Sequence, residues 1–210
     1  GGVQANVEKL THAQIRKKAE VSPLRCADPK AEAKMIALID KAKAAGDTLG
    51  GAIEIVATDL QVGLGSHVQW DRKLDARLSA GLMAIQAIKA VEIGVGTKVS
   101  DLLGSQLHDQ IFHSKQKGFY RKTCRAGGIE GGMTVGGPVV VRIHMKPLST
   151  LRKPMMSVDL KTKKPFVATV ERSDVSAVPA AGVVGEAIVA FELANAFLEK
   201  FGGDSLGELK

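Results

Sequence analysis

A long, predominantly apolar segment near the end of the chain, from about Ala180 to Phe201, constrains the fold most. Its small and aliphatic residues are typical of a helix that packs into a core. Pro179 stands at the helix start, where its missing N–H is tolerated, and Gly202-Gly203 follows the end. The chain therefore needs a core that buries this helix. The polar triplet Arg172-Ser173-Asp174, just before the helix, is expected at the edge of that core.

The triplet Arg172-Ser173-Asp174 has two interpretations on its residues alone. Opposite charges beside a helix start commonly form a capping loop with a surface ion pair, which contributes little to stability. Charged side chains at the end of an element also occur at ligand sites. Residue types and spacing leave both interpretations open, and capping loops are the more frequent of the two.

Composition narrows the class of partner. The 210 residues, 45% hydrophobic and 24% charged, fit one large or two small globular domains. The net charge of +7 favours anionic partners: nucleic acid, an anionic membrane or small phosphorylated ligands. One Trp and one Tyr offer little for stacking on bases, and the cations are scattered, so we expect no nucleic acid. We interpret no stretch as a membrane span. Cys26 and Cys124 predict a reducing, cytoplasmic compartment.

Capping signals predict two helices within the first 50 residues. Thr11 followed by Gln14 fits a capping box, in which each residue satisfies a backbone N–H of the other. Asp28 before Pro29 fits a second helix start, since Asp accepts from free N–H groups and Pro tolerates the first turn. Gly46 is expected to end that helix.

Beyond residue 50, strand and helix patterns alternate, which predicts an α/β protein with layered elements. We interpret residues 1–50 as a helical lead-in, 51–201 as an α/β core and 202–210 as a frayed tail. The expected elements of the core are strands at 51–60, 88–94, 138–147, 157–160 and 165–171, and helices from Asp71 to about Gln86, at 97–103 and at 180–201.

Two polar stretches are interpreted as loops. Residues 105–123 hold His108, Asp109 and His113, but no fourth metal ligand is evident, so we expect a mobile loop and no metal. Lys161–Lys164 is the densest run of positive charge and lies between two short strands, which favours a solvated turn.

Three polar patches stand at the ends of predicted elements: Gly127–Gly132, Lys146–Thr150 and Arg172–Asp174. Glycines allow a ligand to approach the backbone closely. Lysine, arginine and hydroxyl groups donate to anionic oxygens, as in phosphate or flavin contacts. The residues alone therefore predict an α/β domain with an anionic-ligand site.

The same patches resemble the chorismate synthase family. The stretch RSDVSAVPAAGVVGE, which starts at Arg172, is similar to the family's carboxy-terminal signature. KPLST resembles its flavin segment, and RAGGIEGG resembles its glycine-rich loop. Further similar blocks, in family order, are GDTLGG, GLGSHVQWDRKLDARL, LMAIQAIKAVEIG and EKFGGDS.

The resemblance implies a β-α-β sandwich fold and a homotetramer. It also implies a lyase that converts 5-enolpyruvylshikimate 3-phosphate into chorismate by a 1,4-anti elimination of phosphate. Reduced FMN is the implied cofactor, although the reaction has no net redox change. The basic charge of the chain suits the anionic cofactor and a substrate with one phosphate and two carboxylates.

The resemblance also implies residue roles. Asp174 would sit near flavin N5 and help deprotonate it, and Arg172 beside it would favour the ionised carboxylate. The residues implied to contact FMN are Gln86, Ala87, Gly131, Lys146, Pro147, Leu148, Ser149, Thr150 and Arg172. Cys124 departs from the family, where Asn is usual, and a thiol is a poor hydrogen-bonding substitute.

The resemblance covers the carboxy-terminal part of the family. The amino-terminal part, with a Gly-Glu-Ser-His-Gly motif, a catalytic histidine and arginines that hold the substrate, has no counterpart here. We therefore expect the 210 residues to be inactive alone. The alternative is a flavin- or phosphate-binding module without catalysis.

Overall fold

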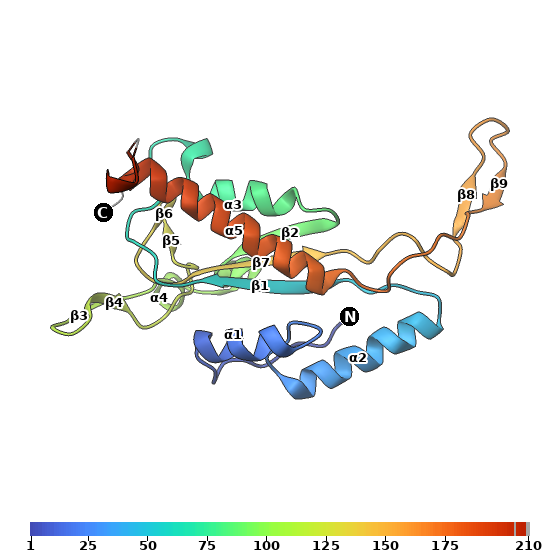
Figure 1. Cartoon of the computed structure of the whole chain (residues 1–210), viewed down its shortest axis with the longest axis horizontal. Coiled ribbons are helices and arrows are strands. Elements are labelled where there is room, and N and C mark those ends of the chain that lie inside the picture. Colours follow the sequence, from blue (N-terminus) through green and yellow to red (C-terminus); the bar gives the residue numbers. More distant parts are fainter. Residues whose placement is uncertain (204, 209–210) are drawn as a thin grey trace. The chain divides into compact units, whose positions relative to one another are not determined.

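The computed structural model of the chain describes residues 1–203 and 205–208. Figure 1 labels its helices and strands. The contacts between residues divide the chain into two compact units. Unit 1 comprises Gly1–Ala52 and Met145–Ala181, and unit 2 comprises Ile53–His144 and Gly182–Lys210. Each unit is therefore built from two stretches of chain that are distant in sequence.

Unit 1 begins with the two predicted helices, α1 (His12–Val21) and α2 (Pro29–Ala44). The capping box at α1 is present as predicted, with the Gln14 N–H donating to the Thr11 hydroxyl and the Thr11 N–H to the Gln14 side chain. The Asp28 carboxylate caps α2 by accepting from the N–H of the second and third helical residues. Local capping thus explains where both helices begin.

Unit 1 also contains a two-stranded antiparallel hairpin of β8 (Met156–Val158) and β9 (Pro165–Val167), drawn in orange in Figure 1. The Asp159 carboxylate accepts from the N–H groups of Lys161 and Thr162 in the connecting turn. This confirms both short strands and the solvated turn at Lys161–Lys164.

Unit 2 is built on a three-stranded sheet in the order β1-β7-β2. The strands are β1 (Gly51–Ala57), β7 (Val139–Met145) and β2 (Ile88–Ile93). Alternate residues of β7, namely Val139, Val141 and Ile143, are fully buried. The α/β class predicted from the sequence is confirmed.

Helices α3 (Leu74–Met83) and α5 (Val178–Phe201) pack beside each other on this sheet (Figure 1). A Cβ atom on Gly185 of α5 would lie 2.6 Å from the Ile55 side chain and 3.4 Å from that of Ile143. A Cβ on Gly81 of α3 would lie 2.9 Å from Ile188 of α5. The missing side chains of these two glycines allow the close approach of helix to helix and of helix to sheet.

A chain of ion pairs crosses the same three strands. The Arg142 guanidinium of β7 lies 2.5 Å from the Glu54 carboxylate of β1 and 3.1 Å from the Glu92 carboxylate of β2. The arginine and both carboxylates retain contact with solvent, so these pairs add little to stability.

Helix α5 is long and apolar enough to cross a membrane by length and composition, and one third of its most apolar window is buried within the structure. The sequence predicts a helix at this position that packs into a core. The Arg77 guanidinium of α3 pairs with Glu192 and Glu199 of α5, at 3.1 and 2.9 Å. These contacts, together with its buried residues, are those of a helix that packs within unit 2.

Two expectations were wrong. Residues 105–123 do not form an unstructured loop: they contain α4 (Gly104–Leu107) and an antiparallel hairpin of β3 (Ile111–Ser114) and β4 (Gly118–Arg121). Cross-strand aromatic pairs stabilise this hairpin, with ring centroids 5.8 Å apart for Phe112 and Tyr120. The helix expected to start at Asp71 instead starts at Leu74, after a 3-10 turn.

The remaining elements are short. The helix expected at 97–103 is a 3-10 helix over Gly96–Asp101, and the glycine-rich stretch forms β5 (Ile129–Glu130) and β6 (Met133–Thr134). The predicted tail at 202–210 lies partly outside the described residues, and its described part includes a 3-10 turn at Leu206–Glu208.

Substitution of Leu78 tests the core of unit 2. Leu78 of α3 is completely buried, so Leu78→Ala should lower the free energy of unfolding by about 2–5 kcal/mol. Leu103→Ala, at a side chain of the same unit that is 69% exposed, should change it by less than about 0.5 kcal/mol. Urea unfolding followed by circular dichroism measures both. Equal losses would contradict the assigned core.

Candidate functional site

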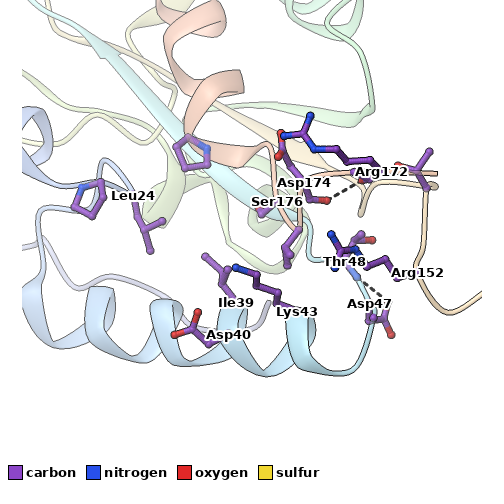
Figure 2. Close-up of a pocket in the computed structure, with 16 residues that line it drawn as sticks. Leu24, Ile39, Asp40, Lys43, Asp47, Thr48, Arg152, Arg172, Asp174 and Ser176 are labelled. Atoms are coloured by element: carbon purple, nitrogen blue, oxygen red, sulfur yellow. Dashed lines mark hydrogen bonds between the residues drawn. The ribbon is translucent and has the colours of Figure 1, made fainter. Parts of the chain in front are cut away.

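Unit 1 contains a pocket of about 520 Å³ (Figure 2). Helix α2 forms one wall, and the stretch from Arg172 to Ser176, which leads into α5, forms the other. Lys43 points from α2 toward that stretch (Figure 2). The polar and charged residues Lys43, Asp47, Thr48, Thr150, Arg152, Arg172, Ser173, Asp174 and Ser176 are among those that line it, together with Gly46. Three of the residues to which the sequence assigns a role at the site, Thr150, Arg172 and Asp174, therefore line one cavity.

The turn between α2 and β1, residues Gly46–Gly51, positions both polar segments of the pocket. The N–H of Leu49 donates to the carbonyl of Val175 at 2.8 Å. The N–H of Lys153 donates to the carbonyl of Gly46 at 3.0 Å. One turn of the lead-in is thus bonded to the stretches that follow Asp174 and Thr150.

The triplet does not form the expected surface ion pair. Within the described residues, no salt bridge or side-chain hydrogen bond engages the Arg172 guanidinium or the Asp174 carboxylate, and the hydroxyl of Ser173 donates to the Asp174 carbonyl at 2.8 Å. The contact at the helix start comes instead from Ser176, whose hydroxyl accepts from the N–H of Val178 at 3.4 Å. Both charged side chains of the triplet are exposed and available to a ligand.

The segment Lys146–Thr150 follows β7 and belongs to no helix or strand. Lys146, Pro147 and Ser149 are exposed, and Thr150 is half-buried against the pocket. Of the five residues implied to contact a flavin here, Thr150 lines the pocket that also contains Arg172 and Asp174.

The other three residues implied to contact a flavin lie in unit 2. Gln86 and Ala87 follow α3, and Ala87 has a φ of 67°, a left-handed conformation that disfavours residues other than glycine. Gly131 stands at the exposed turn between β5 and β6 with a φ of 60° and open space around its missing side chain. Strain of the kind seen at Ala87 occurs preferentially at functional sites.

Asp109 is a residue whose importance the sequence did not reveal. It is 8% exposed, and its carboxylate accepts from the backbone N–H groups of Arg125 and Ala126, both at 3.0 Å. These two residues open the glycine-rich stretch, so Asp109 holds its entrance in place. In the sequence, only its position between His108 and His113 drew attention to it, and a loop was favoured there over a metal site.

Burial by itself would raise the pKa of the Asp109 carboxyl. Hydrogen bonds from Thr123 and from the N–H groups of Arg125 and Ala126, with the positive charge of Arg125, outweigh burial and hold that pKa below its usual value. The carboxylate is therefore the form that the fold requires. Within residues 1–203 and 205–208, no three His, Cys, Asp or Glu side chains come together as a metal site.

Comparison with known proteins identifies the family. The sequence profile of chorismate synthase matches residues 2–198. The chorismate synthase of Geobacter metallireducens is 57% identical over 217 aligned residues, which cover the whole of this chain and 55% of the relative. The chorismate synthase of Desulforamulus reducens is 56% identical over 211 aligned residues, which cover the whole of this chain and 54% of that relative. A solved structure described as a crystal structure of chorismate synthase matches with a TM-score of 0.79 and 43% identity, over 98% of this chain and 53% of that one.

The fold and the pocket thus define an α/β protein with a polar ligand site. The chain belongs to the chorismate synthase family. It spans about half the length of the curated relatives that it matches.

Titration of Asp109 provides a pH-dependent prediction. A carboxylate with a lowered pKa stabilises the fold fully above its unfolded pKa of about 3.9, and this contribution is lost as the pH falls through the lower folded pKa. Asp109→Asn should therefore cost about 1–3 kcal/mol at neutral pH, and its difference from the wild type should shrink in acid. Urea unfolding at a series of pH values measures this.

The control is Asp71→Asn, at an exposed carboxylate of the same unit. It should leave the free energy of unfolding nearly unchanged across the pH range. A cost of Asp109→Asn that stayed constant from neutral pH into acid would contradict the assigned role of the ionised carboxylate.

Proposed function

We propose that this chain supplies the flavin-binding part of a chorismate synthase. The observation that supports this most directly is the pocket of unit 1, which is lined by Thr150 of one sequence motif and by Arg172 and Asp174 of another. Family membership supports the reaction class, a carbon–oxygen lyase that acts on a phosphorylated substrate.

The residues of this pocket fit a reduced flavin mononucleotide. A volume of about 520 Å³ lies within the usual range of small-molecule sites. Within the described residues, no carboxylate neutralises the Arg172 guanidinium, which leaves its donors for a phosphate or a flavin oxygen. The hydroxyl of Thr150 adds a neutral donor at the same cavity.

When bound, reduced FMN would supply an electron transiently to the substrate and take it back, with no net redox change. Arg172 would bind and orient the anionic cofactor. Asp174 would accept a proton at the flavin N5 position, a role that suits an exposed carboxylate without a competing cation. Lys146 and Ser149, both exposed, would extend the set of donors of unit 1.

The proposed reaction is the 1,4-anti elimination of phosphate from 5-enolpyruvylshikimate 3-phosphate to form chorismate. The substrate carries one phosphate and two carboxylates, and the net charge of +7 favours such an anion. A homotetrameric assembly and a cytoplasmic location belong to the same proposal. A chain that spans about half of its relatives would turn over little substrate by itself.

Binding of FMN tests the role of Arg172. Loss of a hydrogen bond to a charged group costs about 1.5–3 kcal/mol, so Arg172→Ala should raise the dissociation constant of reduced FMN about tenfold to a hundredfold. Anaerobic equilibrium dialysis measures it. Arg16→Ala, at an exposed arginine of α1 in the same unit, serves as the matched control and should bind FMN like the wild type. Equal affinities for all three proteins would contradict the assignment.

Turnover tests the role of Asp174. In a chimera, this chain replaces the matching part of the Geobacter metallireducens relative, so that the rest of the family's length is present. Loss of an acid–base group typically costs about 10²–10⁴ in rate, so Asp174→Asn should lower phosphate release with reduced FMN by that factor. Its unfolding midpoint should be unchanged because the carboxylate is exposed. Near-normal turnover would remove Asp174 from the mechanism.

A further inference from the structure

We propose that Thr48 is a positioning residue that holds the Lys146–Thr150 segment in its ligand-binding conformation. Its side chain is 8% exposed, and its hydroxyl donates to the carbonyl oxygen of Leu148 at 2.6 Å. Leu148 is the central residue of the segment. The functional consequence rests on the proposed function, whereas the positioning itself can be measured without a ligand.

The Lys146–Thr150 segment needs such a restraint because it has no regular secondary structure to hold its backbone. Residues Lys146–Thr150 belong to no helix or strand, and Pro147 has no N–H with which to bond a neighbour. Segments held by few hydrogen bonds and little buried apolar surface open easily. A buried hydroxyl bonded to the middle of the segment therefore limits its motion where the exposed Lys146 and Ser149 must be presented together.

The turn that carries Thr48 is itself anchored on both sides. The N–H of Leu49 donates to the carbonyl of Val175, and the carbonyl of Gly46 accepts from the N–H of Lys153. The hydroxyl of Thr48 makes the third of these contacts and the only one of the three from a side chain. The Gly46–Gly51 turn thus lies in hydrogen-bond contact with both segments that contribute to the pocket, and Figure 2 shows Thr48 near Asp47 and Arg152.

Gly50 allows the Gly46–Gly51 turn to lie against the backbone at the start of the Lys146–Thr150 segment. A Cβ atom at this position would lie 2.3 Å from the carbonyl oxygen of Met145 and 2.8 Å from the nitrogen of Pro147. Both distances are far shorter than a van der Waals contact. The atoms concerned belong to the backbone, so they cannot move aside as the end of a flexible side chain could. The backbone of the turn therefore lies directly against the start of the Lys146–Thr150 segment, and the hydroxyl of Thr48 secures its middle.

The test compares Thr48→Val, which removes the hydroxyl at nearly constant volume, with Thr48→Ser, which keeps it. Backbone ¹⁵N relaxation of the 210-residue chain without ligand gives the order parameters of Leu148, Ser149 and Thr150. In Thr48→Val these should fall from a rigid value of about 0.85 to below about 0.6, and in Thr48→Ser they should stay near the wild-type value.

The matched control is Thr11→Val, the same substitution at a hydroxyl that caps α1 in the same unit. It should lower the melting temperature without changing the order parameters of residues 148–150. Unchanged order parameters in Thr48→Val, or an equal fall in Thr11→Val, would overturn the proposal.

Binding of reduced FMN separates this inference from the proposed function. If the positioning role and the proposed function both hold, Thr48→Val should weaken FMN binding about tenfold, because one hydrogen bond of about 1.4 kcal/mol corresponds to a factor of ten. Thr48→Ser should bind FMN like the wild type, and so should Thr11→Val. If the wild-type chain and the chimera bind no FMN, the proposed function fails, and the order parameters alone decide whether Thr48 positions the segment. If the wild type binds FMN and Thr48→Val binds equally well, the positioning role fails and the proposed function stands.

Discussion

Hydrogen bonds at the Gly46–Gly51 turn hold together a unit with a small core. The buried apolar residues of unit 1 are all small: Cys26, Ala27, Ala31, Ala42 and Ala181. Burial of such side chains removes little apolar surface from water, so the hydrophobic effect alone restrains the loops of this unit weakly. The bonds from Thr48 to Leu148 and from Leu49 to Val175 join residues that are at least 100 positions apart in the chain.

Unit 2 is stabilised differently. Leucine, isoleucine and valine side chains from α3, α5 and the three-stranded sheet are buried together, and Gly81 and Gly185 allow the helices to approach closely. Polar groups are rare in this core, and the buried Asp109 is satisfied by backbone N–H groups. The loops of unit 1, in contrast, present charged side chains, and their order depends on a few directional bonds.

Much of the local structure could be predicted from sequence because its causes are local. The capping box at Thr11, the Asp28 cap and the alternation in β7 each depend on neighbours within a few residues, and each was found where expected. The hairpin at β3 and β4 was missed because polar composition hid the cross-strand pairing of Phe112 with Tyr120. The start of α3 was misplaced because Leu74 is held by a distant partner, the carbonyl of Gly132, which accepts from its N–H.

The sequence by itself determined the family, the α/β class and the candidate residues Thr150, Arg172 and Asp174, because motifs and periodicity are properties of neighbouring positions. Only the tertiary structure decided that these residues share one pocket, that Arg172 and Asp174 do not pair with each other, and that the hydroxyl of Thr48 is bonded to the carbonyl of Leu148. The physical reason is that these relations depend on hydrogen bonds and close contacts between segments far apart in the chain. The spacing of residues along the sequence does not show which distant segments make these individual contacts.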